Sequence, residues 1–348
     1  MPGKLQKGQL KMSKRGDVRI IAPLGMSSGA REVALKEVAT WLYRSYFDQS
    51  QKERSWSPYR SFNLNELCQA HSSQITQIVR GFFAVEQFIP DYSSEITRLV
   101  RKNYGQEHFQ QQWGAEEAKH SDLWRLALEY SGSYTNRELT DYADQLKSNE
   151  WGLPWEDPLH MLFYTVVQER ATHMSYSNFR KYLGTCDPVL SEMTRIIAVD
   201  EVYHHNFFLR LAAAYLYFKP AEAAQALCDV LGNFSMPASD IIPDYQAFAA
   251  LLEQGGIYTT RTVAELHVEV RRSLGIRRFK AFEEGVDKSR HVPDPDGCMR
   301  SGAFLNNSFN PAVVEKILVS LFSNVMKFQT DTGLTKDPFS QYLSTEPY

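Results

Sequence analysis

Two short stretches with the same spacing decide how this chain folds: Glu117-Ala118-Lys119-His120 and Glu201-Val202-Tyr203-His204. Each is a Glu-x-x-His, and helix positions three apart share one face, so each pair can direct a carboxylate and an imidazole at one point. Single glutamates in apolar helical patterns, Glu86 and Glu169, lie 31 and 32 residues before the glutamate of the next motif. The pattern therefore indicates one helical hairpin used twice.

The residue types of this repeat predict a metal site. Ionised carboxylates are almost never placed in a protein core unless they are paired or bind metal. Four helices that direct four Glu and two His inward give the ligand set of a carboxylate-bridged di-iron or di-manganese bundle. Oxygen and imidazole ligands without thiolate favour iron or manganese over a zinc–sulfur site. The predicted ligands are Glu86, Glu117, His120, Glu169, Glu201 and His204.

An acid directly precedes the glutamate of each motif: Glu116 in the first motif and Asp200 in the second. Each can accept the second ring N–H of the histidine on the opposite helix, which would fix the tautomer of that histidine. The alternative is a solvated acid on the surface. We expect both acids to support the metal ligands.

Further polar residues lie near the same helices. Thr172 follows Glu169 by three residues and could relay a proton on the oxygen side of the metals, or bond back to a helix carbonyl. His205 is an alternative to His204 as a ligand, because its offset from the motif glutamate also suits a helix. His173 could approach the site as a polar contact.

The remaining pattern is helical, with no convincing strand, so the predicted fold class is all-α: a ferritin-like four-helix di-iron bundle with additional flanking helices. Asp157-Pro158 and Asp187-Pro188 are strong helix starts. A long helix should bend one turn past Glu86, because Pro90 removes the donor for that carbonyl. The predicted helices cover residues 29–47, 63–103, 106–130, 136–148, 158–184, 188–218, 221–231, 243–253, 262–274 and 311–328.

Composition bounds the class of protein. The 348 residues are 43% hydrophobic, enough for one large core, and a net charge of -3 argues against nucleic acid as the main partner. The sequence has no run of about 18 apolar residues, so we predict no membrane span. Four cysteines without metal spacing predict reduced thiols. We expect a basic tail (1–25), a helical domain (26–284), and an extension (285–348) with one helix packed on or near the bundle.

Longer runs around the predicted ligands are similar to one family. Residues 113–120 resemble the W-x-A-E-E-x-x-H motif of the soluble acyl-[acyl-carrier-protein] desaturases, and residues 163–172 resemble their Y-T-x-x-Q-E-R-A-T helix. Residues 200–204 are similar to the family's D-E-x-x-H, and residues 86–92 to its E-x-x-x-P-x-Y. The similarity runs over about residues 56–280.

The resemblance implies a homodimeric enzyme with two iron ions (Fe2+/Fe3+) that acts on an acyl chain carried as a carrier-protein thioester. It would insert a cis double bond with O2 and two electrons from a ferredoxin-type donor. The resemblance links Asp200 and Trp56 to electron delivery and assigns Thr172 to the oxygen side of the metals. The chain departs from the family pattern at three places: Gln87 replaces an acid, His173 stands where an apolar residue is usual, and Val202-Tyr203 replaces a basic pair. The cytoplasm of a bacterium is the expected compartment, with the plastid stroma as the alternative.

The substrate and its carrier need surfaces of their own. An acyl chain needs an apolar tunnel beside the metals, and its predicted walls are Phe82, Phe83, Met161, Tyr164, Val166 and His173. An acidic carrier protein needs a basic docking rim, and the candidates are Arg271, Arg272, Arg277, Arg278 and Lys280, with a plain solvated face as the alternative.

We also weighed three rival functions for the same residues. A di-iron hydroxylase or N-oxygenase of a secondary pathway would add one oxygen to its substrate, whereas a desaturase removes two hydrogens. An iron-storage protein would be shorter and carry an acidic nucleation surface. A non-catalytic carrier-protein binder would have no need of six intact ligands.

Overall fold

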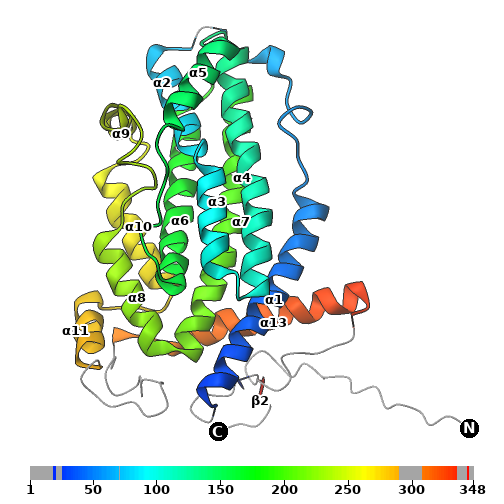
Figure 1. Ribbon diagram of the computed structural model, residues 1–348, viewed down its shortest axis with the longest axis vertical. Helices are drawn as coiled ribbons and strands as arrows, with labels where there is room; N and C mark the ends of the chain where they lie inside the picture. Colours follow the sequence, from blue (N-terminus) through cyan, green and yellow to red (C-terminus); the bar gives the residue numbers. More distant parts are fainter. Residues whose placement is uncertain (1–18, 21–25, 70, 290–307, 335–342, 345–348) are drawn as a thin grey trace, which may run out of the picture.

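Long helices with polar caps make up the fold (Figure 1). The computed structural model describes residues 19–20, 26–69, 71–289, 308–334 and 343–344. Within this part of the chain, the strands are one short antiparallel pair, β1 (Arg19–Ile20) with β2 (Leu343–Ser344). The all-α prediction is confirmed. The predicted basic tail lies outside the described residues, except for β1.

Four helical rods form the core of the molecule and run side by side in Figure 1. One rod consists of two consecutive helices, and it packs against the next helix along the chain. The two remaining rods pack along each other. The rods are α2 (Ser73–Glu86) with α3 (Ile89–Val100), α4 (Tyr104–Tyr130), α6 (Pro158–Leu183) and α7 (Pro188–Phe218).

The two Asp-Pro signals start α6 and α7 as predicted. Asp157 accepts hydrogen bonds from the backbone N–H groups at the start of α6. Asp187 accepts from the N–H of Leu190 at 2.9 Å and also from the N–H of Cys68 at 2.8 Å, and its Oδ2 lies 2.8 Å from His71 Nε2. Its cap therefore also ties the loop before α2 to the start of α7.

The prediction of a single helix over residues 63–103 is wrong. Ser72 caps α2 at its start, and Asn63 precedes only a short 3-10 turn, η2 (Leu64–Glu66). The predicted bend is a complete break, because Pro90 occupies the first turn of α3, where a missing N–H is tolerated. The break leaves Glu86 as the last residue of α2.

Two further boundaries differ from the prediction. Helix α1 (Ser28–Glu53) continues beyond residue 47, the predicted end of the first helix, and α4 begins at Tyr104, before the predicted start at residue 106. A Cβ at Gly105 would lie 2.2 Å from the backbone carbon of Ala39 in α1. Gly105 therefore lies inside α4, where the missing side chain allows the close approach of α1. The other predicted helices are confirmed, with ends shifted by a few residues.

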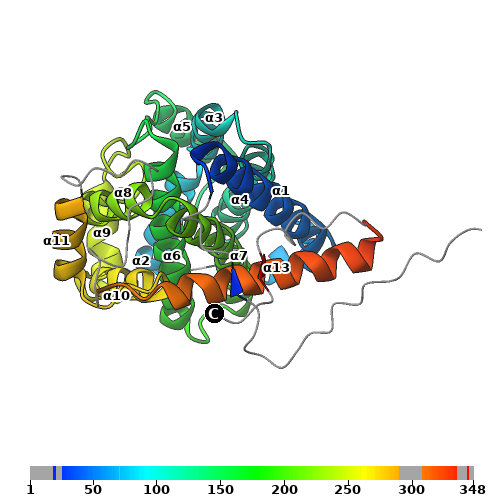
Figure 2. The same ribbon diagram turned by 90° about the horizontal axis from the view of Figure 1, so that it is seen from below.

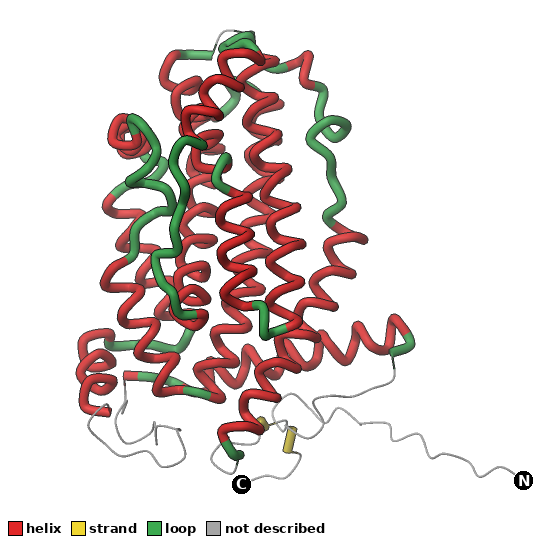
Figure 3. The backbone as a smooth tube through the Cα atoms, in the orientation of Figure 1, coloured by secondary structure: helices red, strands yellow, loops and turns green. Residues whose placement is uncertain are grey.

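The flanking helices cover the core. Helix α13 lies across one end of the bundle and packs on α7 and α1 (Figures 1 and 2). Loops join the helices around the rods, as the tube in Figure 3 shows. Helix α11 was not predicted from the sequence. The flanking helices are α5 (Asn136–Leu146), α8 (Pro220–Asn233), α9 (Tyr245–Gln254), α10 (Thr260–Ser273), α11 (Phe279–Ser289) and α13 (Pro311–Thr332).

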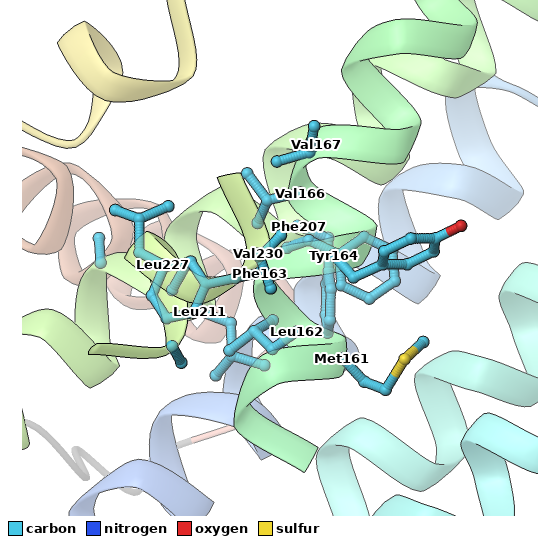
Figure 4. Close-up of a cluster of buried hydrophobic side chains, with 14 of the residues drawn as sticks. Met161, Leu162, Phe163, Tyr164, Val166, Val167, Phe207, Leu211, Leu227 and Val230 are labelled. Carbon is cyan, nitrogen blue, oxygen red and sulfur yellow. The ribbon is translucent and has the colours of Figure 1, made fainter. Parts of the chain in front are cut away.

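Two apolar clusters fill the interior. The larger one includes the α6, α7 and α8 side chains of Figure 4, and the smaller one surrounds Phe82 and Trp124. Along α4 the larger cluster ends at Trp113 and the smaller begins at Leu123, so both motif residues of that helix lie between the clusters. Apolar packing therefore flanks the predicted site on both sides along α4.

Within the described residues, no helix combines the length and the apolar character that crossing a bilayer requires.

The two Asp-Pro caps provide a matched test of stability. We expect Asp187→Ala to lower the free energy of unfolding by about 2 kcal/mol, and Asp157→Ala by about half of that. The Asp187 side chain is 1% exposed and holds a second segment, whereas that of Asp157 is 56% exposed. Urea denaturation of both variants measures the difference. Equal losses would contradict the tie between α7 and the loop.

The effect of Asp187 should depend on pH. Burial disfavours its charge, but hydrogen bonds from Leu190 and Cys68 prevail and lower its pKa. Its stabilising effect is therefore complete above the unfolded-state pKa of about 4, and is lost as the pH falls through the lower folded-state pKa. The stability difference between the wild type and Asp187→Ala should shrink in that acidic range.

Candidate metal centre

All six predicted metal ligands meet in the interior. They form two groups, and in each group one ligand atom from every residue lies within 4.8 Å of the others. Glu117 and Glu201 belong to both groups. Two metal positions that share two carboxylates are therefore possible. The first group is Glu86, Glu117, His120 and Glu201, and the second is Glu117, Glu169, Glu201 and His204.

Buried atoms without partners show that these residues fit metal ions. Both carboxylate oxygens of Glu201 are buried without a hydrogen-bond partner, as are Glu117 Oε1 and His204 Nδ1. The last two atoms lie 2.8 Å apart without forming a hydrogen bond. An unpaired buried polar atom costs about 1–3 kcal/mol, and more if it is charged. Two divalent cations would bind these atoms and offset the four carboxylate charges.

The acids of the two groups have opposing pKa shifts. Burial, followed by the charge of Glu117, raises the pKa of Glu86 to about 8. Burial, with the charges of Glu117 and Glu169, raises the pKa of Glu201 well above its usual range. Burial also opposes the charge of Glu117, but contact with His120 and His204 lowers its pKa to about 2. Burial is thus the largest cause of both raised pKa values, and the charges of neighbouring acids add to it.

Each histidine is held from outside by an acid on another helix. His120 Nε2 lies 3.3 Å from Asp200 Oδ2, and His204 Nε2 lies 2.9 Å from Glu116 Oε2. The two contacts predicted from the sequence are therefore present. They leave Nδ1 of both rings on the side of the buried carboxylates, with His120 Nδ1 2.9 Å from Glu117 Oε2.

Aromatic donors near the site were not predicted. Tyr176 donates from its hydroxyl to Glu86 Oε1 at 2.6 Å, and Trp113 Nε1 donates to Glu169 Oε1 at 3.0 Å. Tyr176 follows Glu169 by two helical turns, so their shared helix face could have revealed it. These bonds orient Glu86, which belongs only to the first ligand group, and Glu169, which belongs only to the second.

The other histidine candidates point elsewhere. His205 Nδ1 donates to the carbonyl of Val166 at 2.9 Å, and burial lowers the pKa of His205 to about 4. It joins neither ligand group. His173 Nδ1 donates to the carbonyl of Ala198 at 2.9 Å, and the ring lines a groove between α6 and α7. His173 is therefore not beside the metal residues.

A narrow cavity reaches the ligand groups. Glu86, Glu117 and Glu201 lie in its wall, and Thr172 lines it from α6. The Thr172 hydroxyl donates to the carbonyl of Gln168 at 3.0 Å, as the structural alternative expected. The rest of the wall comprises Phe82, Val85, Ile89, Tyr92, Trp113, Gln168, Ser175, Tyr176, Met236, Pro237, Tyr245, Phe248, Leu252 and Tyr258.

Only Phe82 of the six predicted tunnel residues lines this cavity. Met161 and Val166 lie in the larger apolar cluster (Figure 4), and Tyr164 donates to the carbonyl of Ser235 at 3.0 Å. Phe83 belongs to the smaller cluster, and His173 lies in the α6–α7 groove. Met161, Tyr164 and Val166 lie outside this cavity because α6 lines it through Gln168, Thr172, Ser175 and Tyr176, which come later in the helix.

The basic residues proposed for docking lie at the end of α10 and around the start of α11. The Arg271 guanidinium packs over the Phe279 ring at 4.7 Å, and its Nε donates to the carbonyl of His267. Arg272, Arg277, Arg278 and Lys280 are exposed. Figure 1 places α11 at the opposite end of the molecule from α9, which lines the cavity.

A single ligand substitution tests the metal site. Glu169→Ala should reduce the iron content from two ions per chain to at most one, because the second group loses a carboxylate that no neighbour replaces. Metal analysis after anaerobic loading with Fe(II) measures this, with circular dichroism to show that the helices persist. Glu283→Ala, at an exposed position of α11, is the control. Two ions in both variants would contradict the ligand assignment.

Comparisons with known proteins identify the family. A family model described as fatty acid desaturase matches residues 37–292. Acyl-[acyl-carrier-protein] desaturase 4, chloroplastic, of Oryza sativa subsp. japonica is 30% identical over 167 residues, 44% of this chain and 40% of that protein. Stearoyl-[acyl-carrier-protein] 9-desaturase 6, chloroplastic, of Arabidopsis thaliana is 29% identical over 163 residues, 44% of this chain and 41% of that protein. The matches thus span about two fifths of these relatives.

A solved structure has the same fold. DesA2 of Mycobacterium tuberculosis H37Rv, provisionally titled an acyl-ACP desaturase, aligns with a TM-score of 0.50 at 17% identity. The alignment covers 69% of this chain and 94% of that chain. The family model spans well over half of the sequence and includes all six residues of the metal centre. This chain therefore belongs to the fatty acid desaturase family, in its acyl-[acyl-carrier-protein] type.

Proposed function

We propose that this protein is a di-iron desaturase that introduces a double bond into an acyl chain carried as an acyl-carrier-protein thioester. The observation that supports this most directly is the cavity, because three acids of the metal centre lie in a wall that is otherwise mainly apolar and aromatic. An acyl chain in this cavity would lie directly beside both metal positions.

The reaction explains why metals are needed. Methylene C–H bonds resist acid–base chemistry, so two bound irons would supply the oxidising power by activating O2. Removing two hydrogens from the chain and reducing O2 to two waters consumes two further electrons and two protons. The protein must therefore bind the chain, exclude water and provide routes for electrons and protons.

A contact at the surface of the bundle supports an electron route. The Trp56 indole stacks on the His120 ring at 6.1 Å with an interplanar angle of 7°. Its Nε1 donates to Asp200 Oδ2 at 2.8 Å, and the same acid contacts His120. Trp56 is partly exposed, so an external donor of the ferredoxin type could reach it. We assign electron entry to Trp56 and Asp200.

Thr172 is the residue to which we assign proton delivery on the cavity side. Its hydroxyl lines the cavity that contains Glu86, Glu117 and Glu201. The same hydroxyl accepts a hydrogen bond from Gln168 Nε2 at 3.3 Å and donates to the Gln168 carbonyl. Its hydrogen would have to rotate away from that carbonyl to serve a reaction in the cavity.

The polar part of the same wall favours one second candidate function. Gln168, Thr172 and Ser175 give the cavity amide and hydroxyl groups close to the metal residues. A substrate with a polar group near its reacting carbon would suit them, as in a di-iron hydroxylase or N-oxygenase. Iron storage and carrier binding without catalysis have no comparable support.

The partners follow from the proposed substrate. An acyl carrier protein would deliver the chain, and the basic residues of α10 and α11 are its proposed docking rim. We propose a homodimer and a cytoplasmic setting. The Cys68 and Cys186 thiols form no disulfide, which suits a reducing compartment.

Product mass tests the reaction. The protein, loaded anaerobically with Fe(II) and given O2, a ferredoxin system and a panel of acyl-carrier thioesters, should release products that have lost two hydrogens. Glu169→Ala should release none. Mass spectrometry reads both outcomes. Gain of one oxygen would support the hydroxylase instead, and unchanged thioesters across the panel would contradict both.

Phe248, a large ring in the cavity wall, should limit the length of the chain that the cavity accepts. Phe248 packs edge-on against Phe82 at 5.6 Å, in a space that exists because residue 81 is glycine: a Cβ there would lie 2.1 Å from the Phe248 ring. Phe248→Ala should therefore let longer chains react. Phe179→Ala is the matched control, because Phe179 packs on Phe82 at 5.3 Å outside the cavity wall.

Both substitutions should cost about 3–5 kcal/mol of stability, because each removes a buried ring. Only Phe248→Ala should shift the longest thioester converted, as measured with saturated chains of increasing length. The same shift in both variants would show that a general loosening of the fold, not the Phe248 ring in the cavity wall, changes the limit.

A further inference from the structure

One buried arginine outside the ligand set lies between the two acids that hold the histidines. Arg54 follows the last residue of α1, and its side chain is 5% exposed. Its Nη1 lies 3.1 Å from Asp200 Oδ1 and 3.8 Å from Glu116 Oε2. No other lysine or arginine in the described part of the chain forms an ion pair with either acid.

Aromatic rings hold this guanidinium in place. Its carbon lies 4.8 Å from the Tyr46 ring centre and 4.1 Å from that of Tyr203. Tyr46 also donates from its hydroxyl to Glu116. Arg54, Tyr46 and Glu116 thus form one unit built from α1 and α4, while Tyr203 and Asp200 belong to α7.

The position of Arg54 is costly. Its Nε and Nη2 are buried without a hydrogen-bond partner. Removing a charge from water costs several kcal/mol, and each unpaired buried donor costs more. An apolar side chain between two tyrosine rings would avoid these costs. Packing alone therefore does not explain why an arginine lies here.

The charge of the interior does explain it. Two divalent ions would offset the four ligand carboxylates, but the two outer acids would still bring two negative charges next to the histidines. Arg54 contacts both outer acids and offsets one of these charges. Six buried acids surround the metal positions: Glu86, Glu116, Glu117, Glu169, Asp200 and Glu201.

We propose that Arg54 is a positioning residue that holds Glu116 and Asp200 together and sets the charge around both metal positions. It acts through His204 on one ligand group and through His120 on the other, because each acid contacts one of these rings. The inference rests on the proposed di-iron function. Loss of the Arg54 charge leaves the interior more negative, which favours the more highly charged, oxidised ions.

The experiment compares three variants of the full chain. Arg54→Met removes the charge and the unpaired N–H groups but keeps an unbranched side chain between the rings. Arg54→Lys keeps the charge. Arg44→Met is the matched control, because Arg44 is an exposed residue of α1 that packs over the Trp41 ring at 4.9 Å. Iron content, thermal stability and the midpoint reduction potential of the bound iron are measured for each.

The expected result is a lower reduction potential in Arg54→Met with two irons still bound, a potential closer to the wild type in Arg54→Lys, and no change in Arg44→Met. A residue that only fills space would leave the potential of Arg54→Met unchanged, and that result overturns the proposal. If Arg54→Met does not fold, Arg54→Gln takes its place as the variant without the charge. Equal shifts of the reduction potential in Arg54→Lys and Arg54→Gln would then also overturn the proposal. If the wild-type protein binds no iron, the metal centre itself is refuted. The iron content measures this outcome separately from the reduction potential.

Discussion

Mutual repulsion of buried carboxylates is the constraint on which the rest of this structure depends. Six acids and two histidines lie buried between two apolar clusters. Such a group is unstable unless cations, hydrogen bonds or protons neutralise it. Each element around the site serves this need: the tyrosine and tryptophan donors orient single glutamates, the outer acids hold the histidines, and an arginine joins the outer acids.

The ligand set could be predicted from the sequence because helix geometry converts spacing directly into position. Glu117 and His120 share a helix face wherever that helix lies, and a glutamate in an apolar run needs an explanation of its own. The histidine–acid contacts followed from the same reasoning. Identical local signals also marked the starts of α6 and α7, since Asp is a preferred N-cap residue and Pro is favoured at the first helical position.

Features that depend on how distant segments meet could not be predicted in this way. Arg54 reaches the site from the end of α1, beyond residues 29–47 that were predicted for this helix. The tunnel residues were placed on the wrong part of α6, because the side that the cavity occupies is set by α9 and the segment after α8. The break at Pro90 looked like a bend, although the two helices that meet there pack separately on α4.

The central claim is that this interior binds two metal ions that share Glu117 and Glu201. A crystal structure of the protein loaded anaerobically with Fe(II), with anomalous scattering measured at the iron edge, tests it most directly. The account predicts two iron peaks about 3.5–4 Å apart, one beside His120 and one beside His204. A single peak, or iron bound only at surface acids while the six ligand side chains keep their present contacts, would contradict it.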